Sequence, residues 1–229
     1  MRRFLLSIVS SALLFAAGTT NAALFVFEDL NASNGGPIGN KLDTVSSSYN
    51  DSSDVFTWAA TFSMNDVVDS FWLVVNNGPN PKSSNVNELA IMYGDVDNGI
   101  VTTYAYNGAN SDNSWSNPGI YLGSSKLNST ANSVSFSLDA TDINAWNSPG
   151  QTAPGYKGIQ FDEKIGIWFH IARDSQFLYD LDGLITSYTR GAQGWYDKAN
   201  LTATRVPAPG VWLLLALGLG AVALRKKLT

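Results

Sequence analysis

Short segments of this chain alternate strictly between apolar and small polar residues, and this alternation restricts the fold more than any other feature. Residues 133–138 carry a serine at every odd position and Val, Phe or Leu at every even one. In residues 56–64, apolar side chains again occupy every second position. Because successive side chains of a strand point to opposite faces, a period of two predicts strands that are buried on one face.

Further candidate strands are rich in β-branched and aromatic residues, and segments rich in Gly, Pro and Asn separate them. They are residues 24–30, 71–76, 88–93, 100–106, 119–123, 165–172, 184–190 and 201–205. About ten short strands without a long helical pattern predict an all-β fold, an antiparallel β-sandwich of the jelly-roll or lectin-like kind. A single helical turn is expected where Thr141 and Asp142 precede Ile143.

The apolar positions of the alternating segments predict the hydrophobic core. Its expected members are Phe56, Trp58, Phe62, Val134, Phe136, Leu138, Ile165, Ile167 and Phe169. A core of this kind belongs to one domain, because the sequence shows neither an internal repeat nor a linker between modules.

The first 22 residues have the pattern of a secretory signal peptide. Arg2 and Arg3 precede an apolar stretch that is too short to span a bilayer comfortably, and small residues follow it as far as Ala22. The pattern predicts cleavage after Ala22 and leaves residues 23–205 as the folded domain.

The C-terminal segment, residues 206–229, begins with a proline motif and ends with a basic cluster. The motif consists of Val206, Pro207, Ala208, Pro209 and Gly210. The apolar residues 211–224 then predict a hydrophobic helix, and Arg225, Lys226 and Lys227 would hold its end on the cytoplasmic side of a membrane.

This arrangement resembles the PEP-CTERM sorting segment of Gram-negative bacteria, although Ala208 stands where that family usually carries Glu. The resemblance implies that an exosortase-type membrane enzyme recognises Pro207 and Pro209 and cuts nearby. It also implies a transient inner-membrane precursor, a mature protein that is secreted or held at the cell surface, and an association with exopolysaccharide and biofilm. A plain C-terminal membrane anchor is the alternative.

Charge and cysteine content exclude several classes of function. The net charge is −5, all nineteen acidic residues lie between Glu28 and Asp197, and five of the fourteen basic residues lie in the terminal segments. Nucleic-acid binding needs clustered Lys and Arg, so no nucleic-acid partner is expected. The absence of cysteine excludes disulfides, lipoprotein acylation and thiolate metal sites.

Candidate catalytic residues are few. The single histidine, His170, shares one strand face with Trp168, and no Gly-x-Ser-x-Gly motif occurs. Glycoside hydrolysis would need two carboxyl groups across a cleft, for which Glu88 and Glu163 are candidates. We therefore expect a protein that is not an enzyme and has no cofactor, with a secreted glycan-active enzyme using Glu88 or Glu163 as the alternative.

Asp95 and Asp97 lie between two candidate strands and precede Asn98-Gly99. Asp-Asn-Gly is common in hairpin turns, although carboxylates at alternate positions also suit Ca²⁺. We expect a turn here and no metal site.

Three tryptophans lie in polar segments that have the composition of loops. They are Trp115, Trp146 and Trp195. Aromatic faces beside Asn and Asp suit neutral sugars, which present C–H patches and hydroxyls together. These residues predict a carbohydrate-binding site, and the alternative is that their rings cover the ends of the core. The leading hypothesis is a non-enzymatic protein of the exopolysaccharide matrix, with extracellular polysaccharide as a partner.

Overall fold

The computed structural model describes residues 23–63, 68–81, 89–106, 114–117, 119–144, 158–159 and 161–207. The chain divides into two units, of which the larger is Phe25–Arg205 and the other joins Met1–Leu24 with Val206–Thr229. The second unit lies almost entirely outside the described residues. The larger unit contains the sheet, apart from the first two residues of β1 and the last two of β13.

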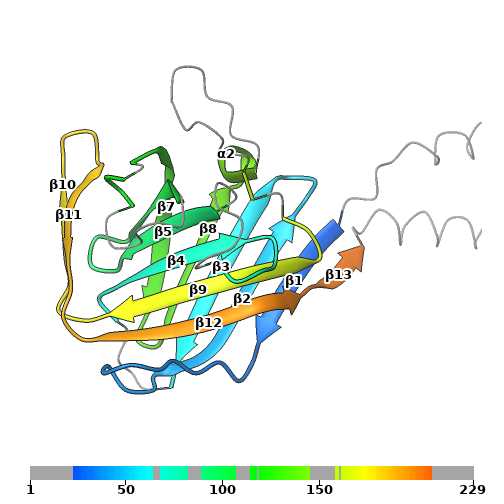
Figure 1. Cartoon of the computed structure of the whole chain (residues 1–229), viewed down its shortest axis with the longest axis horizontal. Helices are drawn as coiled ribbons and strands as arrows, with labels where there is room; N and C mark the ends of the chain where they lie inside the picture. Colours follow the sequence, from blue (N-terminus) through cyan, green and yellow to red (C-terminus); the bar gives the residue numbers. More distant parts are fainter. Residues whose placement is uncertain are drawn as a thin grey trace, which may run out of the picture. The chain divides into compact units, whose positions relative to one another are not determined.

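The described residues form strands and one helical turn (Figure 1). The elements are β1 (Ala23–Asp29), β2 (Leu42–Asn50), β3 (Val55–Phe62), β4 (Ser70–Asn76), β5 (Leu89–Asp95), β6 (Ile100–Tyr106), β7 (Tyr121–Thr130), β8 (Ser133–Asp139), α2 (Thr141–Asn144), β9 (Lys164–Ala172), β10 (Gln176–Tyr179), β11 (Ile185–Thr189), β12 (Gln193–Thr202) and β13 (Thr204–Pro207). The predicted all-β class is therefore confirmed, and the expected helical turn is α2.

Eleven strands make one continuous sheet in the order β12-β9-β4-β5-β6-β7-β8-β3-β2-β1-β13, and β10 and β11 pair separately as a hairpin. Every pairing from β12 as far as β2 is antiparallel. β7 links two halves, because its residues 121–126 pair with β6 and its residues 127–130 pair with β8. Gly123, at the register shift of β7, has a φ of 140°, which an L side chain rarely adopts.

The two halves of the sheet pack their inner faces against each other. Trp58 of β3 lies 5.2 Å from Phe169 of β9 between ring centroids, and Phe71 of β4 lies 6.2 Å from Phe136 of β8. Every residue predicted for the core is buried. Each such side chain contributes roughly 1.5–3 kcal/mol relative to an exposed position, so this layer supplies most of the stability.

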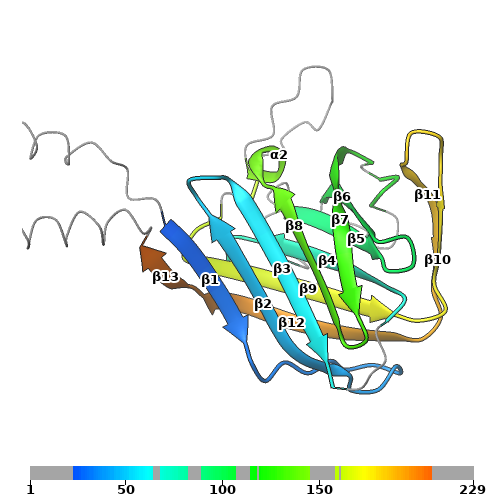
Figure 2. The ribbon, with the colours of Figure 1, turned by 180° about the vertical axis from the view of Figure 1, so that it is seen from behind.

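One half is buried on one face only. β3 and β8 alternate between buried and partly exposed residues, as their sequences predict. The outward side of β2, β3, β7 and β8, the strands in front in Figure 2, carries a group of uncharged residues that are all at least partly exposed, here called the hydroxyl face. They are Thr44, Ser46, Ser48, Thr57, Ala59, Thr61, Asn128, Thr130, Ser133, Ser135 and Ser137.

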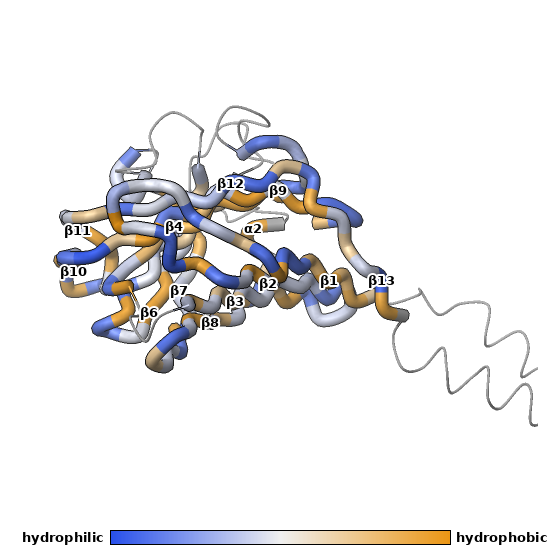
Figure 3. The backbone as a smooth tube through the Cα atoms, turned by 90° about the horizontal axis from the view of Figure 1, so that it is seen from below, coloured by the Kyte–Doolittle hydropathy of each residue, from blue (hydrophilic) through white to orange (hydrophobic). Residues whose placement is uncertain are grey.

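The centre of the other half is buried on both faces. All seven residues of β4 are buried, and so are all residues of β6 except the first. Their sequences accordingly read as nearly continuous apolar runs, which is typical of strands covered on two sides. In Figure 3, β9 is coloured largely hydrophobic, whereas its neighbour β12 at the edge is largely hydrophilic.

The strand predictions failed at four places. β2, β10 and most of β12 were not expected: β2 and β12 are rich in polar residues, and β10 is only four residues long. The expected strand 119–123 extends to Thr130 as β7. In each case tertiary pairing overrides a weak local preference for the strand conformation.

Candidate functional site

The outward side of β12, β9, β4, β5 and β6, here called the aromatic face, carries rows of rings. Strand register places Trp195 beside His170, His170 beside Trp72 and Trp72 beside Tyr93. The rings of His170 and Trp72 stack 4.0 Å apart, and Trp168 meets Trp72 edge-on at 4.5 Å. Aromatic pairs in these arrangements contribute about 0.5–1.5 kcal/mol beyond their buried area.

The β10–β11 hairpin covers the β5–β6 end of the aromatic face. Tyr188 packs edge-on against Tyr93 at 5.9 Å and stacks on Phe177 at 4.4 Å. The Tyr104 hydroxyl accepts a hydrogen bond from the Ile185 backbone N–H at 3.1 Å, and burial raises the pKa of Tyr104 to about 12. The hairpin is therefore docked by rings and by polar contacts together.

A buried carboxylate also holds the hairpin. Asp95 is 3% exposed and accepts hydrogen bonds from Asn98 N at 3.0 Å, Asn98 Nδ2 at 2.7 Å and the Tyr179 hydroxyl at 2.9 Å. Burial, and then the hydrogen bond to Asp95, raise the pKa of Tyr179. The predicted turn is confirmed at Val96–Gly99, and Asp97 is exposed beside it.

At its β12 end the aromatic face is not covered in the same way. Trp195 is 43% exposed, and Trp168 and His170 are half-buried. Asp197, which is exposed, pairs in register with Trp168 just as Trp195 pairs with His170. We call these four residues the platform. It presents three aromatic rings and one carboxylate as a two-by-two patch on two neighbouring strands.

Two glycines fix the Trp195 ring. Gly35 and Trp195 exchange backbone hydrogen bonds of 2.9 and 3.1 Å, which seats the loop after β1 along the edge of β12. A Cβ atom on Gly36 would lie 2.8 Å from the Trp195 ring, and the φ of Gly36 is 101°. The ring lies against bare backbone, so the platform has a defined shape before any ligand binds.

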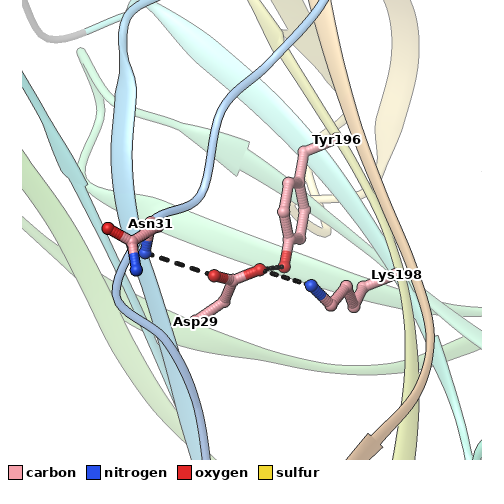
Figure 4. A network of polar contacts seen from close by, with 4 residues as sticks. All are labelled: Asp29, Asn31, Tyr196 and Lys198. Atoms are coloured by element: carbon pink, nitrogen blue, oxygen red, sulfur yellow. Dashed lines mark hydrogen bonds and ion pairs between the residues drawn. The ribbon is translucent and has the colours of Figure 1, made fainter.

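A polar cluster on the inward side of β12 anchors the same strand to β1 (Figure 4). Asp29 accepts hydrogen bonds from the Tyr196 hydroxyl at 2.8 Å and from Lys198 Nζ at 2.9 Å, and also from Asn31 N at 3.2 Å. Burial raises the pKa of Asp29, but the bonds from Lys198, Tyr196 and Asn31 outweigh it, so that the pKa lies below its ordinary value. Burial, and then the bond to Asp29, raise the pKa of Tyr196.

Comparisons with family models, with curated proteins and with solved structures were made for the whole chain. None of them finds a match. The geometry of the described residues therefore carries the functional argument.

The three tryptophans predicted to bind carbohydrate are not found together in one site. Trp195 belongs to the platform, but it lies in β12, so the expectation of a loop around it is wrong. Trp115 is half-buried and packs against the core cluster of the aromatic face, which fits the alternative role of covering the core. Trp146 lies outside the described residues.

The candidate catalytic and sorting residues remain apart from the platform or outside the description. Glu163 is exposed directly before β9, and its backbone carbonyl accepts a hydrogen bond from Ala203 N at 2.8 Å. Val206 and Pro207 end β13. Glu88, Ala22, Ala208, Pro209 and Gly210 lie outside the described residues, as do residues 211–224.

Within the described part of the chain, no three His, Cys, Asp or Glu side chains gather as a metal site. The same residues include no helix that is both long and apolar enough to cross a membrane.

Sequence reasoning missed Trp168, His170 and Asp197 as members of a site. Trp168 and His170 were correctly placed on one face of one strand, and their rings lie 5.4 Å apart. The missing step was the pairing of β9 with β12, which brings Trp195 and Asp197 beside them. The two aromatic residues at alternate positions 168 and 170 were the available signal.

Proposed function

We propose that this protein is a secreted, non-enzymatic component of an extracellular polysaccharide matrix, and that it binds neutral glycan through the platform. The observation that carries the proposal is the row of half-exposed rings on β9 and β12 with Asp197 beside it. We further propose that the domain belongs to the jelly-roll or lectin-like class of β-sandwich, since its two sheet halves pack face to face.

The chemistry of the platform favours a neutral sugar ring. The face of a pyranose presents C–H groups, which gain by covering the exposed part of the Trp195 ring. Its hydroxyls can donate to the Asp197 carboxylate, and hydrogen bonds to a charged acceptor are the stronger kind. The same carboxylate disfavours uronic acids and phosphorylated sugars by like-charge repulsion.

The location of the protein rests on its terminal segments. Cleavage after Ala22 and processing by an exosortase-type enzyme at Val206–Gly210 would release the domain or leave it at the cell surface of a Gram-negative bacterium. Support comes from the extended conformation of Val206 and Pro207 in β13, which suits recognition of the motif as a strand. Mass spectrometry of the mature protein should then detect no peptide from residues 211–224, and recovery of that segment would favour the plain anchor.

The binding proposal is tested with a glycan array of neutral and acidic polysaccharides, followed by calorimetry on the best neutral ligand. Trp195→Ala should weaken binding at least about tenfold, because truncating a central aromatic anchor costs more than about 1.4 kcal/mol. Leu181→Ala is the matched control, since Leu181 is a fully exposed apolar residue at the tip of the β10–β11 hairpin.

Three results would contradict the proposal. They are no glycan bound by the wild type, equal binding by Trp195→Ala with an unchanged circular dichroism spectrum, or stronger binding of acidic than of neutral glycans. Hydrolysis of a bound glycan that Glu88→Gln or Glu163→Gln abolishes would instead establish the glycan-active enzyme.

A further inference from the structure

A pocket of about 350 Å³ opens at the end of the sheet where β6 and β7 approach β8 and α2. Five of its lining residues are polar: Thr103, Ser124, Ser125, Asp139 and Thr141. None of them belongs to the platform. The volume lies within the range of about 300–1,000 Å³ that is usual for small-molecule sites.

The irregular backbone around the pocket is held in place by hydrogen bonds. Ala140 N donates to the Asp54 carbonyl at 2.6 Å, and Ile143 N donates to the Ala140 carbonyl at 3.1 Å, which fixes α2 against the turn between β2 and β3. A Cβ atom on Gly123 would meet no atom of the described residues within 4 Å, so among them the register shift of β7 leaves open space there. The cavity is therefore preformed.

The carboxylate of Asp139 lines the pocket, and hydrogen bonds from Thr141 orient it. Asp139 Oδ1 accepts hydrogen bonds from Thr141 Oγ1 at 2.6 Å and from Thr141 N at 3.0 Å. These bonds hold the pKa of Asp139 below its ordinary value. Among the described residues no donor bonds to Oδ2, so that oxygen is available to accept from a ligand.

The lining combines this acceptor with four hydroxyls and an apolar floor. Thr103, Ser124, Ser125 and Thr141 can each donate and accept a hydrogen bond. Leu122, Leu138 and Ile143 are buried beneath them. Such a lining is matched by a compact molecule with many hydroxyls and one apolar face, and mismatched by an anion.

We propose that this pocket binds a single neutral sugar unit, either a free monosaccharide or the end of a glycan chain. The inference rests on the proposed function for the class of ligand only, because the site is separate from the platform. Together the two sites would let one domain hold the side of a glycan chain at the platform and a chain end at the pocket.

The test is a titration of the ¹⁵N-labelled full-length chain with glucose, galactose, mannose and N-acetylglucosamine, followed by two-dimensional NMR. At least one sugar should shift the amide signals of residues 123–125 and 139–143 with saturation in the millimolar range. The indole signal of Trp195 should move less, and Trp195→Ala should leave the affinity of the pocket unchanged.

Ser125→Leu should reduce this affinity at least tenfold by filling the cavity, whereas Ser129→Leu, an exposed position on the same strand, should not change it. Glucuronate should bind more weakly than glucose, and Asp139→Asn should narrow that difference. The proposal is overturned if none of the four sugars shifts residues 123–125 in the wild type, or if Ser125→Leu and Ser129→Leu bind alike. If the wild type binds glycan at the platform but no sugar at the pocket, this inference is wrong and the proposed function stands. If it binds a sugar at the pocket but no glycan at the platform, the proposed function is wrong and this inference stands.

Discussion

The outward side of β2, β3 and β8 carries serine and threonine, whereas that of β9, β4 and β5 carries tryptophan, histidine, tyrosine and isoleucine. The hydroxyl face is stabilised by short cross-strand contacts such as Thr44 Oγ1–Thr61 Oγ1 and Ser48 Oγ–Thr57 Oγ1, both 2.6 Å. It can face water without a cover. The aromatic face needs one, and the β10–β11 hairpin provides it over part of its area.

This contrast shows that one backbone geometry supports two different uses of an outward face. On the hydroxyl face, side chains are small and exchange hydrogen bonds with water at little net cost. On the aromatic face, burial continues outward into a second hydrophobic cluster, and only the platform end stays exposed. An exposed aromatic patch beside a covered one is typical of a binding surface.

The largest effect on the free energy of unfolding is expected at the centre of the aromatic face, and it distinguishes this face from the hydroxyl face. Trp72 is 1% exposed although it lies on the outward side of β4, so Trp72→Ala should lower the free energy of unfolding by about 3–5 kcal/mol, as in a core. Urea unfolding followed by circular dichroism measures it.

Trp72→Phe is the control for this substitution. It keeps an aromatic ring and removes Nε1, which is buried without a hydrogen-bond partner among the described residues. It should cost clearly less than Trp72→Ala. A loss below about 1 kcal/mol for Trp72→Ala would mean that the aromatic face is a surface like the hydroxyl face.

An intermediate effect concerns the contact that joins the two halves at their open edge. Asp29→Asn should lower the free energy of unfolding by about 1–2 kcal/mol at pH 7, since it weakens charged hydrogen bonds to Tyr196 and to the partly exposed Lys198. The folded-state pKa of Asp29 lies below its ordinary value of about 3.8. Its contribution is therefore present above about pH 4 and is lost as the pH falls through the folded-state pKa.

Unfolding curves of the wild type and of Asp29→Asn between pH 7 and pH 2.5 check this sign. The two proteins should differ at neutral pH and converge in acid. A difference that stays constant over this range, or that grows in acid, would show that the ionised carboxylate does not tie β12 to β1.

The smallest effect is expected on the hydroxyl face. Ser135 lies at its centre, between Ala59 and Asn128 in register, and is partly exposed. Ser135→Ala should change the free energy of unfolding by no more than about 0.5 kcal/mol, which is usual for surface positions. A loss above 1.5 kcal/mol in the same urea assay would indicate that the hydroxyls act as one cooperative network.

The same contrast explains which parts of the fold could be predicted from the sequence. Strands buried on one face, such as β3 and β8, could be predicted because apolar and polar residues alternate in their sequences. β4 and β6 are recognisable as apolar runs. β2 and β12 were missed because their polar residues carry no periodic signal of sufficient strength, and only pairing with β3 and β9 fixes them as strands.

The candidate site was predictable only in part, for a related reason. Trp195 was identified because an aromatic residue in a polar segment is conspicuous. Its neighbours Trp168 and His170 are distant in sequence, and the register of β9 with β12 is a tertiary property. The pocket beside Asp139 was not predicted, because it depends on a register shift in β7 and on the position of α2.

The ion pair between Asp29 and Lys198 has a consequence for how the chain folds. Its two residues are 169 positions apart in sequence, and β4 obtains its second neighbour only when β9 has been made. Folds dominated by such distant pairings close slowly, on a scale of about milliseconds to seconds. Until β9 (Lys164–Ala172) has been synthesised, β4 presents an open, apolar edge that other chains can join. Chains truncated before β9 should therefore be prone to aggregation.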